Sequence, residues 1–317
     1  MARPSPLALG WLAFSIAACT GEVEGSGGGA ATTTASGNTT SGPTTTTTAS
    51  TTSSTTGTGG TGGGSADPCA GAIFCETFED YTDVGTLADA QTFGPWRAAL
   101  DTNGGSMDLD DAHTTSGTRA LHTRIETGTS AGGRLFANGD LPLFTGGPTH
   151  LYGRMMMYID PNGTSVHWTF FGASGDAEPS SPEVGRRATY LMSSLPRDGV
   201  NTYSFVYGLE GTNTDPYHDC WFQSEGAMPT AEWTCVQFEM DSVTRSLRMW
   251  TGDPSTPTVA VDDVGQGCVG DVPGDSPWYG PVWEEIYLGA WSFHDMDAPL
   301  EVWIDDLAIG TAPMPCP

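Results

Sequence analysis

Apolar and polar residues alternate with a period of two along much of the chain beyond residue 66. In His150–Asp160 the alternation separates two faces of one extended segment, as in a β-strand. One face carries Leu151, Met155, Met157 and Ile159, and the other carries Tyr152, Arg154, Met156 and Tyr158. Trp233–Asp241 alternates in the same way, and a polar turn leads to a second alternating run at Leu247–Thr251. This pair predicts a β-hairpin.

Similar runs recur along the rest of the chain, at Ala120–Glu126, Val166–Gly172, Thr189–Leu195, Tyr203–Leu209, Val259–Asp263, Ile286–His294 and Leu300–Ile309. Gly, Pro, Asn and Asp separate the runs and mark turns. About a dozen short strands of this kind predict an all-β fold, a two-sheet antiparallel sandwich. The sequence has no helical period longer than two turns and no internal repeat.

Residues 1–19 have the pattern of a secretory signal, with Arg3 before an apolar stretch that ends near Cys19. The stretch is shorter than the roughly 20 apolar residues that a transmembrane helix needs. Ile16-Ala17-Ala18-Cys19 resembles the bacterial lipobox, in which the cysteine is lipidated and becomes the new N-terminus. We therefore expect an exported lipoprotein anchored at the outer membrane or cell surface, with an ordinary signal peptide as the alternative.

Residues 20–66 contain 17 Thr, 13 Gly and 7 Ser, and almost no apolar side chains. Such a segment cannot bury enough surface to fold, so we expect a disordered tether. Residues 67–317 remain as one domain, which the tether would hold away from a membrane.

The chain has a formal net charge of -27 with 11 basic residues, all of them arginines. A chain this acidic does not follow a phosphate backbone, which excludes nucleic acid as a partner. The absence of lysine also excludes Schiff-base chemistry and P-loop sites. We expect a monomer.

Six cysteines remain once Cys19 is set apart, and in an exported chain they predict three disulfides. They are Cys69, Cys75, Cys220, Cys235, Cys268 and Cys316. Sequence does not choose among the 15 possible connectivities. Cys220–Cys235 is the pairing that we favour, because two strand-like segments flank a turn between these residues. Zinc is not expected, because the sequence has no CxxC or HExxH spacing.

Several short motifs resemble the concanavalin A-like lectin/glucanase superfamily, and within it the core domain of fungal Cip-type proteins and related polysaccharide lyases. They are Phe74-Cys75-Glu76-Thr77-Phe78-Glu79-Asp80, Gly153-Arg154-Met155, Val166-His167-Trp168, the hairpin from Trp233 to Trp250, and Trp303-Ile304-Asp305-Asp306-Leu307. The resemblance covers about Ile73 to Thr311. It implies a jelly roll of two curved sheets with polysaccharide bound across the concave one.

The resemblance also implies a structural calcium ion that ties the first strand to the last, with Glu79 and Asp305 as ligands. Asp305 shares a strand face with Trp303, Leu307 and Ile309, and a buried carboxylate needs a cation or several hydrogen-bond donors. Hard oxygen ligands suit calcium. The alternative is a carboxylate capped by backbone amides or arginine.

A sugar site needs aromatic faces with a few polar groups beside them. The candidates are Tyr152, Arg154, Tyr158, His167 on the expected neighbouring strand, Tyr203, Tyr207, Trp291 and His294. If the protein is a polysaccharide lyase acting on uronates, the resemblance implies Arg154, His167 and a tyrosine, Tyr158 or Tyr203, as the catalytic group. The alternative role for each aromatic residue is core packing.

The sequence departs from alginate-lyase patterns. Ser165 stands where those sequences have glutamine, and the run Ile286–His294 lacks their lysine and has Phe293 at the place of the tyrosine. The Glu-x-Asp-x-x-Glu strand of laminarinase-type hydrolases is absent as well. We therefore favour a polysaccharide-binding domain over a lyase, with a surface adhesion or structural module as a further alternative.

Overall fold

The computed structural model describes residues 67–161, 165–177, 186–209, 218–252, 254–262 and 279–317. The predicted signal peptide with Cys19 and the predicted tether lie outside the described residues. In the described part, no helix is long and apolar enough to cross a membrane.

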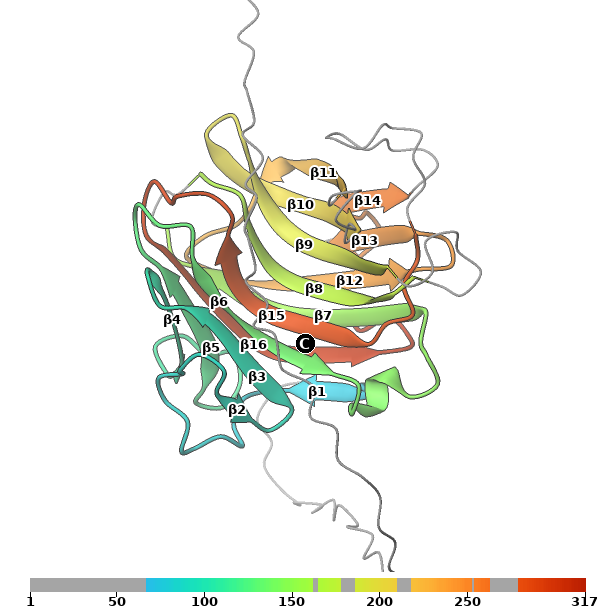
Figure 1. Cartoon of the computed structure of the whole chain (residues 1–317), viewed down its shortest axis with the longest axis horizontal. Coiled ribbons are helices and arrows are strands. Elements are labelled where there is room, and N and C mark those ends of the chain that lie inside the picture. Colours follow the sequence, from blue (N-terminus) through green and yellow to red (C-terminus); the bar gives the residue numbers. More distant parts are fainter. Residues whose placement is uncertain (1–66, 162–164, 178–185, 210–217, 253, 263–278) are drawn as a thin grey trace, which may run out of the picture. The chain divides into compact units, whose positions relative to one another are not determined.

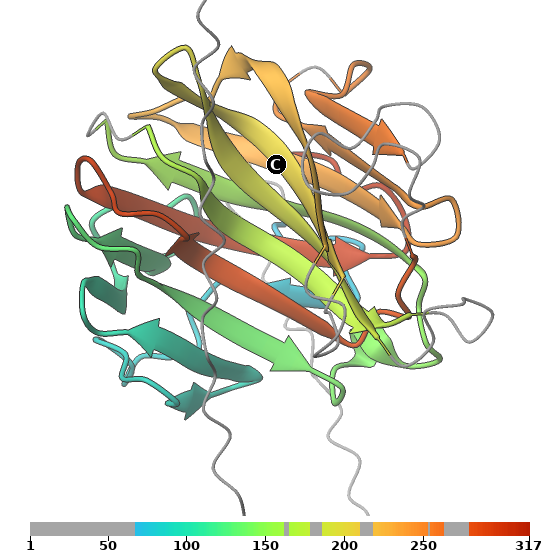
Figure 2. The ribbon, with the colours of Figure 1, turned by 45° about the horizontal axis from the view of Figure 1, so that its top comes forward.

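The described strands form two antiparallel sheets of eight strands each (Figures 1 and 2). Sheet A has the order β14-β13-β12-β7-β16-β5-β4, and β1 pairs with β16. Its strands are β1 (Phe74–Glu76), β4 (Gly105–Asp110), β5 (Ala120–Ile125), β7 (His150–Ile159), β12 (Trp233–Asp241), β13 (Ser246–Trp250), β14 (Val259–Asp262) and β16 (Leu300–Gly310).

Sheet B has the order β11-β10-β9-β8-β15-β6-β3-β2. Its strands are β2 (Thr92–Phe93), β3 (Trp96–Asp101), β6 (Gly132–Asn138), β8 (Trp168–Asp176), β9 (Arg187–Arg197), β10 (Val200–Leu209), β11 (His218–Ala227) and β15 (Glu285–Ser292). One 3-10 turn, η1 (Pro142–Phe144), follows β6. The predicted all-β, two-sheet antiparallel jelly-roll sandwich is confirmed.

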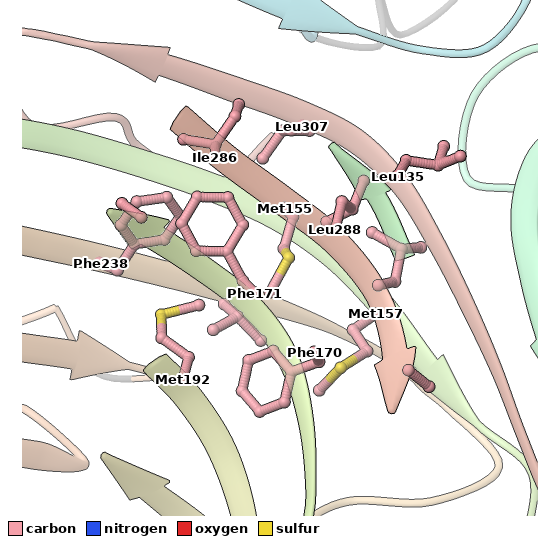
Figure 3. Close-up of a cluster of buried hydrophobic side chains, with 14 of the residues drawn as sticks. Leu135, Met155, Met157, Phe170, Phe171, Met192, Phe238, Ile286, Leu288 and Leu307 are labelled. Carbon is pink, nitrogen blue, oxygen red and sulfur yellow. The ribbon is translucent and has the colours of Figure 1, made fainter. Parts of the chain in front are cut away.

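The core lies between the sheets and consists of the inward-facing apolar residues that the alternation predicted. Met155 and Met157 of β7 are at most 1% exposed, and Phe171 of β8 packs on Phe238 of β12 with ring centroids 4.6 Å apart. Figure 3 shows these side chains converging from both sheets. Gly153 is required on β7 because a Cβ there would come within 2.2 Å of the Phe238 ring.

Two disulfides join described residues, Cys69–Cys75 and Cys235–Cys316. The predicted pairing of Cys220 with Cys235 is therefore wrong. Cys235 lies on β12, and the C-terminal segment reaches this strand because Gln237 donates a hydrogen bond to the carbonyl of Met314. Cys268 and the side chain of Cys220 lie outside the described residues.

Candidate functional site

Three predicted ligand-binding residues, Tyr152, Arg154 and Tyr158, lie on the outer face of β7 in sheet A. Arg154 is only 3% exposed, because its guanidinium donates to the carbonyl of Pro68. Burial lowers the pKa of Arg154. Tyr158 stacks on His113 with ring centroids 4.0 Å apart. The chain itself covers the arginine that was expected to meet a ligand, so this expectation is not met.

His167 lies just before β8 of sheet B, so the predicted group of Arg154, Tyr158 and His167 is divided between two sheets. The expectation that His167 neighbours β7 is wrong, since β7 pairs with β12 and β16. Tyr203 and Tyr207 belong to the core and are 1% and 2% exposed. They therefore pack between the sheets and do not line a groove.

A different group of residues meets on the outer face of sheet B, around Arg134 of β6. The guanidinium carbon lies 4.6, 5.0 and 5.5 Å from the ring centroids of Tyr287, Trp291 and Phe293. Arg134 also donates a hydrogen bond of 3.3 Å to the hydroxyl of Thr169. Rings at these distances attract and orient a cation. We call Arg134, Tyr287, Trp291 and Phe293 the Arg134 cluster.

Strand β15 pairs with β6, the strand of Arg134, in unbroken register from Glu285 to Trp291. The register of β15 on β8 shifts between Leu288 and Trp291. Gly289, within this shift, has φ +130°, which favours glycine, and a Cβ there would come within 2.4 Å of the carbonyl oxygen of Gly133. Tyr287 and Trp291 are four residues apart on β15, so they share a face and contact the same arginine.

An apolar row extends the cluster across the strands of sheet B. Its members pack separately from the main core, which places them on the outer face, and they are Phe136, Leu191, Val206 and Tyr287. Arg97 of β3 lies over the ring of Phe136, 5.5 Å from its centroid. The outer face of sheet B thus combines two guanidinium groups with a band of aromatic and aliphatic side chains.

Two histidines lie beside the exposed ring of Phe293. The His167 ring lies 5.3 Å from Phe293 and 6.0 Å from His294, between centroids. The hydroxyl of Ser292 donates to the carbonyl of His294 at 2.6 Å and also lies 3.2 Å from that of His167, which joins the two segments. Burial, together with the charges of His294 and Arg134, lowers the pKa of His167 to about 4. This imidazole is therefore neutral at pH 7.

A cavity of about 660 Å³ lies at the end of β15 opposite to Trp291. Its charged lining residues are Asp140, Arg187, Glu284 and Glu285. Arg187 donates to the hydroxyl of Ser174 at 2.8 Å and pairs with Glu285 at 3.2 Å and Glu284 at 3.4 Å. These contacts fix the guanidinium against the strands, and the carboxylates remain in excess.

The predicted calcium ligands Glu79 and Asp305 both accept hydrogen bonds from the segment that precedes β5. Glu79 accepts from the backbone of Thr118 and Arg119 at 2.7 Å, and Asp305 accepts from the backbone and hydroxyl of Thr115 at 2.9 Å. Burial raises the pKa of Asp305 to about 6. Backbone amides thus donate hydrogen bonds to both carboxylates, which is the arrangement named above as the alternative to calcium. A calcium ion would have to displace these amide donors.

In the described part of the chain, one group of three possible metal ligands lies close together, Asp108, Asp110 and His122 of sheet A. The His122 Nδ1 atom is 3.1 Å from Asp108 and 3.3 Å from Asp110, and its Nε2 atom is 3.4 Å from Glu301. Burial lowers the pKa of His122, but the hydrogen bond to Asp108 and the three negative charges raise it overall. The three carboxylates therefore favour the protonated form of His122.

Sequence reasoning missed Arg134, which is the centre of the site. The run Gly132–Asn138 does alternate, with Leu135 and Ala137 inward and Arg134 and Phe136 outward, but two glycines open it and weaken the strand signal. Of the predicted residues, His167, Trp291 and His294 do lie at this site. Tyr287 was noted only as part of the run Ile286–His294.

No protein-family model and no curated protein matches the sequence. The structure is similar to that of the cellulose-induced protein Cip1, with a TM-score of 0.49 and 14% identity over 77% of this chain and 100% of that one. It is also similar to an endo-β-1,4-glucuronan lyase from the fungus Trichoderma reesei (TM-score 0.47, 11% identity, 71% and 94% covered). A glycoside hydrolase family 16 endo-glucanase from Bacteroides ovatus gives a TM-score of 0.44 at 11% identity, with 75% and 99% covered. The two eight-stranded antiparallel sheets of the described residues form a jelly-roll sandwich.

Proposed function

We propose that this protein binds polysaccharide through the outer face of sheet B. The observation that carries the proposal is the guanidinium of Arg134 held within 5.5 Å of three aromatic rings. Trp291 and the 41%-exposed Phe293 offer apolar faces for stacking on pyranose rings. Arg134 offers a planar fork of donors that matches a sugar carboxylate or a pair of hydroxyls.

Polysaccharide lyase activity is the second candidate, because Arg134, Tyr287 and His167 supply the residue types of a β-elimination. An arginine would neutralise the uronate carboxylate, and the histidine and tyrosine would move protons. Two observations rank binding first. The Nε2 atom of His167 is buried, and a pKa of about 4 makes this imidazole a weak base. A base with a pKa near the working pH is the efficient one.

Arg134→Ala is expected to weaken retention on a glycan array by 10- to 100-fold, which is about 1.4–2.8 kcal/mol. Arg134→Lys should recover only part of this loss, because an ammonium lacks the planar fork. Arg248→Ala is the matched control, since this arginine lies on sheet A, where it pairs with Glu239 at 3.0 Å.

The same samples separate binding from catalysis when they are incubated with alginate, glucuronan and pectate. We expect no absorbance from an unsaturated uronate product. Steady product formation that His167→Ala abolishes would make the protein a lyase. If wild type, Arg134→Ala and Arg248→Ala retain glycan equally, the outer face of sheet B has no sugar site. The protein would then be a structural or adhesion module.

We also propose that the domain is exported and held at a bacterial membrane by lipid on Cys19. The lipobox-like run Ile16–Cys19 and the Thr/Gly/Ser-rich segment after it support this anchoring. Cys19→Ala is expected to move the protein out of the detergent-extracted membrane fraction, because stable anchoring needs acyl chains. If the variant stays in the membrane fraction as wild type does, Cys19 does not carry the lipid anchor.

Structural calcium at Glu79 and Asp305 stays a prediction. If the ion binds there, chelation should lower the melting temperature, and Asp305→Ala should remove this sensitivity. Calcium at 100 times its dissociation constant would add about 2.7 kcal/mol of stability. The measurement is a thermal melt of metal-free protein with chelator and with excess calcium. Identical melts would leave the amides of the Thr115–Arg119 segment as the partners of these carboxylates.

A further inference from the structure

We infer that the polysaccharide-binding face has a second subsite, the cavity at Arg187 and Glu285, which accepts an uncharged stretch of the same polysaccharide chain. This inference rests on the proposed function and specifies its ligand. The ligand would be a polysaccharide chain several sugars long. Any uronate in it would bind at Arg134, and the sugars in the cavity would be uncharged.

Strand β15 connects the two subsites. Glu285 borders the cavity, and Tyr287 and Trp291 contact Arg134 on the same outer face of the sheet. The seven residues from Glu285 to Trp291 are six steps along the strand and span about 20 Å at roughly 3.3 Å per step. A monosaccharide or disaccharide cannot bridge that length, but a longer chain can. Simultaneous contact with Glu285 in the cavity and with Trp291 at the far end of the Arg134 cluster therefore requires a longer chain.

The two subsites differ in charge. Arg97 and Arg134 lie among the aromatic rings at one subsite. Asp140, Glu284 and Glu285 face a single guanidinium, that of Arg187, at the other subsite. An excess of carboxylates repels a uronate, whereas carboxylates and a fixed guanidinium together accept from and donate to sugar hydroxyls. The cavity therefore selects uncharged residues.

The cavity is also built to keep its polar groups in place. Arg187 is held by the Ser174 hydroxyl at 2.8 Å and by Glu285 at 3.2 Å. Phe144, which is 8% exposed, supplies apolar lining next to these charges. Apolar walls with a few fixed polar groups are typical of small-molecule and sugar sites.

The first test compares chain lengths, by isothermal titration of the full chain with oligosaccharides of two and eight residues from the glycan that the array retains best. Wild type should bind the octasaccharide at least tenfold more tightly than the disaccharide. Arg187→Ala should reduce octasaccharide affinity by about five- to tenfold and leave disaccharide affinity unchanged. Arg134→Ala should reduce both affinities.

The second test compares charge, with all-uronate octasaccharides as the probe. Asp140→Asn/Glu284→Gln removes two exposed carboxylates from the cavity and should raise affinity for the probe at least fivefold. The control is Asp111→Asn/Glu126→Gln, which removes two exposed charges elsewhere. It should change this affinity less than twofold, because distant exposed charges are screened.

The outcomes separate this inference from the proposed function. Loss of binding by Arg134→Ala, combined with no length-dependent effect of Arg187→Ala, would retain the proposed function and overturn the second subsite. If both double variants raise affinity for the all-uronate octasaccharide equally, the cavity does not select against uronates. The net charge of the protein alone would then explain the higher affinity. A wild type that retains no glycan of any length would overturn both proposals.

Discussion

Phe171→Ala is expected to lower the free energy of unfolding by about 3–5 kcal/mol, the cost of truncating a fully buried aromatic residue. Phe171 of sheet B is 0% exposed, and its ring lies 4.6 Å from that of Phe238 of sheet A, so this contact joins the two sheets. Figure 3 shows that Met155 and Met192 pack around the pair. Alanine would leave a cavity that strands on both sides cannot close without losing their pairing.

Urea denaturation followed by tryptophan fluorescence measures this loss. Phe293→Ala is the matched control, because Phe293 is 41% exposed and should lose less than about 1 kcal/mol. The same control should weaken glycan retention, since Phe293 belongs to the Arg134 cluster. A loss below 1 kcal/mol for Phe171→Ala would contradict the packing of this core.

The period-two pattern predicted the strands whose two faces differ most in polarity. β12 begins and ends where the alternation of Trp233–Asp241 does, and β7 ends one residue before the predicted Asp160. The residues assigned to the inner face of β7 are all buried, and of those assigned to its outer face only Arg154 is buried as well. Such strands are predictable because one face meets the core and the other does not.

Strands with weaker alternation were not predicted, and this affected the prediction of the site. β6 begins with two glycines and β4 begins with one. β11 contains Cys220, where the sequence indicated a strand-like segment without defining its bounds. Because β6 was missed, Arg134 never entered the sequence-based site, although it contacts three aromatic rings there.

Alternation shows which residues share a face of one strand, but not which sheet the strand joins. Tyr203 and Tyr207 were correctly assigned to one face of β10, yet this face is the inner one. Arg154 and His167 are close in sequence, but the chain passes from sheet A to sheet B between them. Only long-range pairing decides these points, and a single sequence does not reveal it.

The charge pattern of the two subsites accounts for a point that composition left open. A chain of net charge -27 repels a polyuronate unless arginines gather locally. Arginine is nevertheless concentrated at one end of the sheet B face, where Arg97 and Arg134 lie against aromatic rings. A local basic end within an acidic domain fits a polysaccharide that carries few uronates.

Removing the Cys235–Cys316 disulfide is expected to lower the free energy of unfolding by about 4.5 kcal/mol, through the double variant Cys235→Ala/Cys316→Ala. The bond joins residues that are 81 apart, so it strongly restricts the unfolded chain. Cys69–Cys75 joins residues only 6 apart, and Cys69→Ala/Cys75→Ala should therefore lose only about 2 kcal/mol in the chain-entropy account.

The two double variants form a matched pair, because each removes one disulfide and adds two alanines. Urea denaturation of both, next to wild type, measures the difference. A loss for Cys235→Ala/Cys316→Ala that is no larger than that for Cys69→Ala/Cys75→Ala would contradict the entropic origin. In that case the native contacts of the C-terminal segment, such as the bond from Gln237 to Met314, would hold it on β12 without the disulfide. A larger loss for the long loop would support restriction of the unfolded chain as the source of the stabilisation.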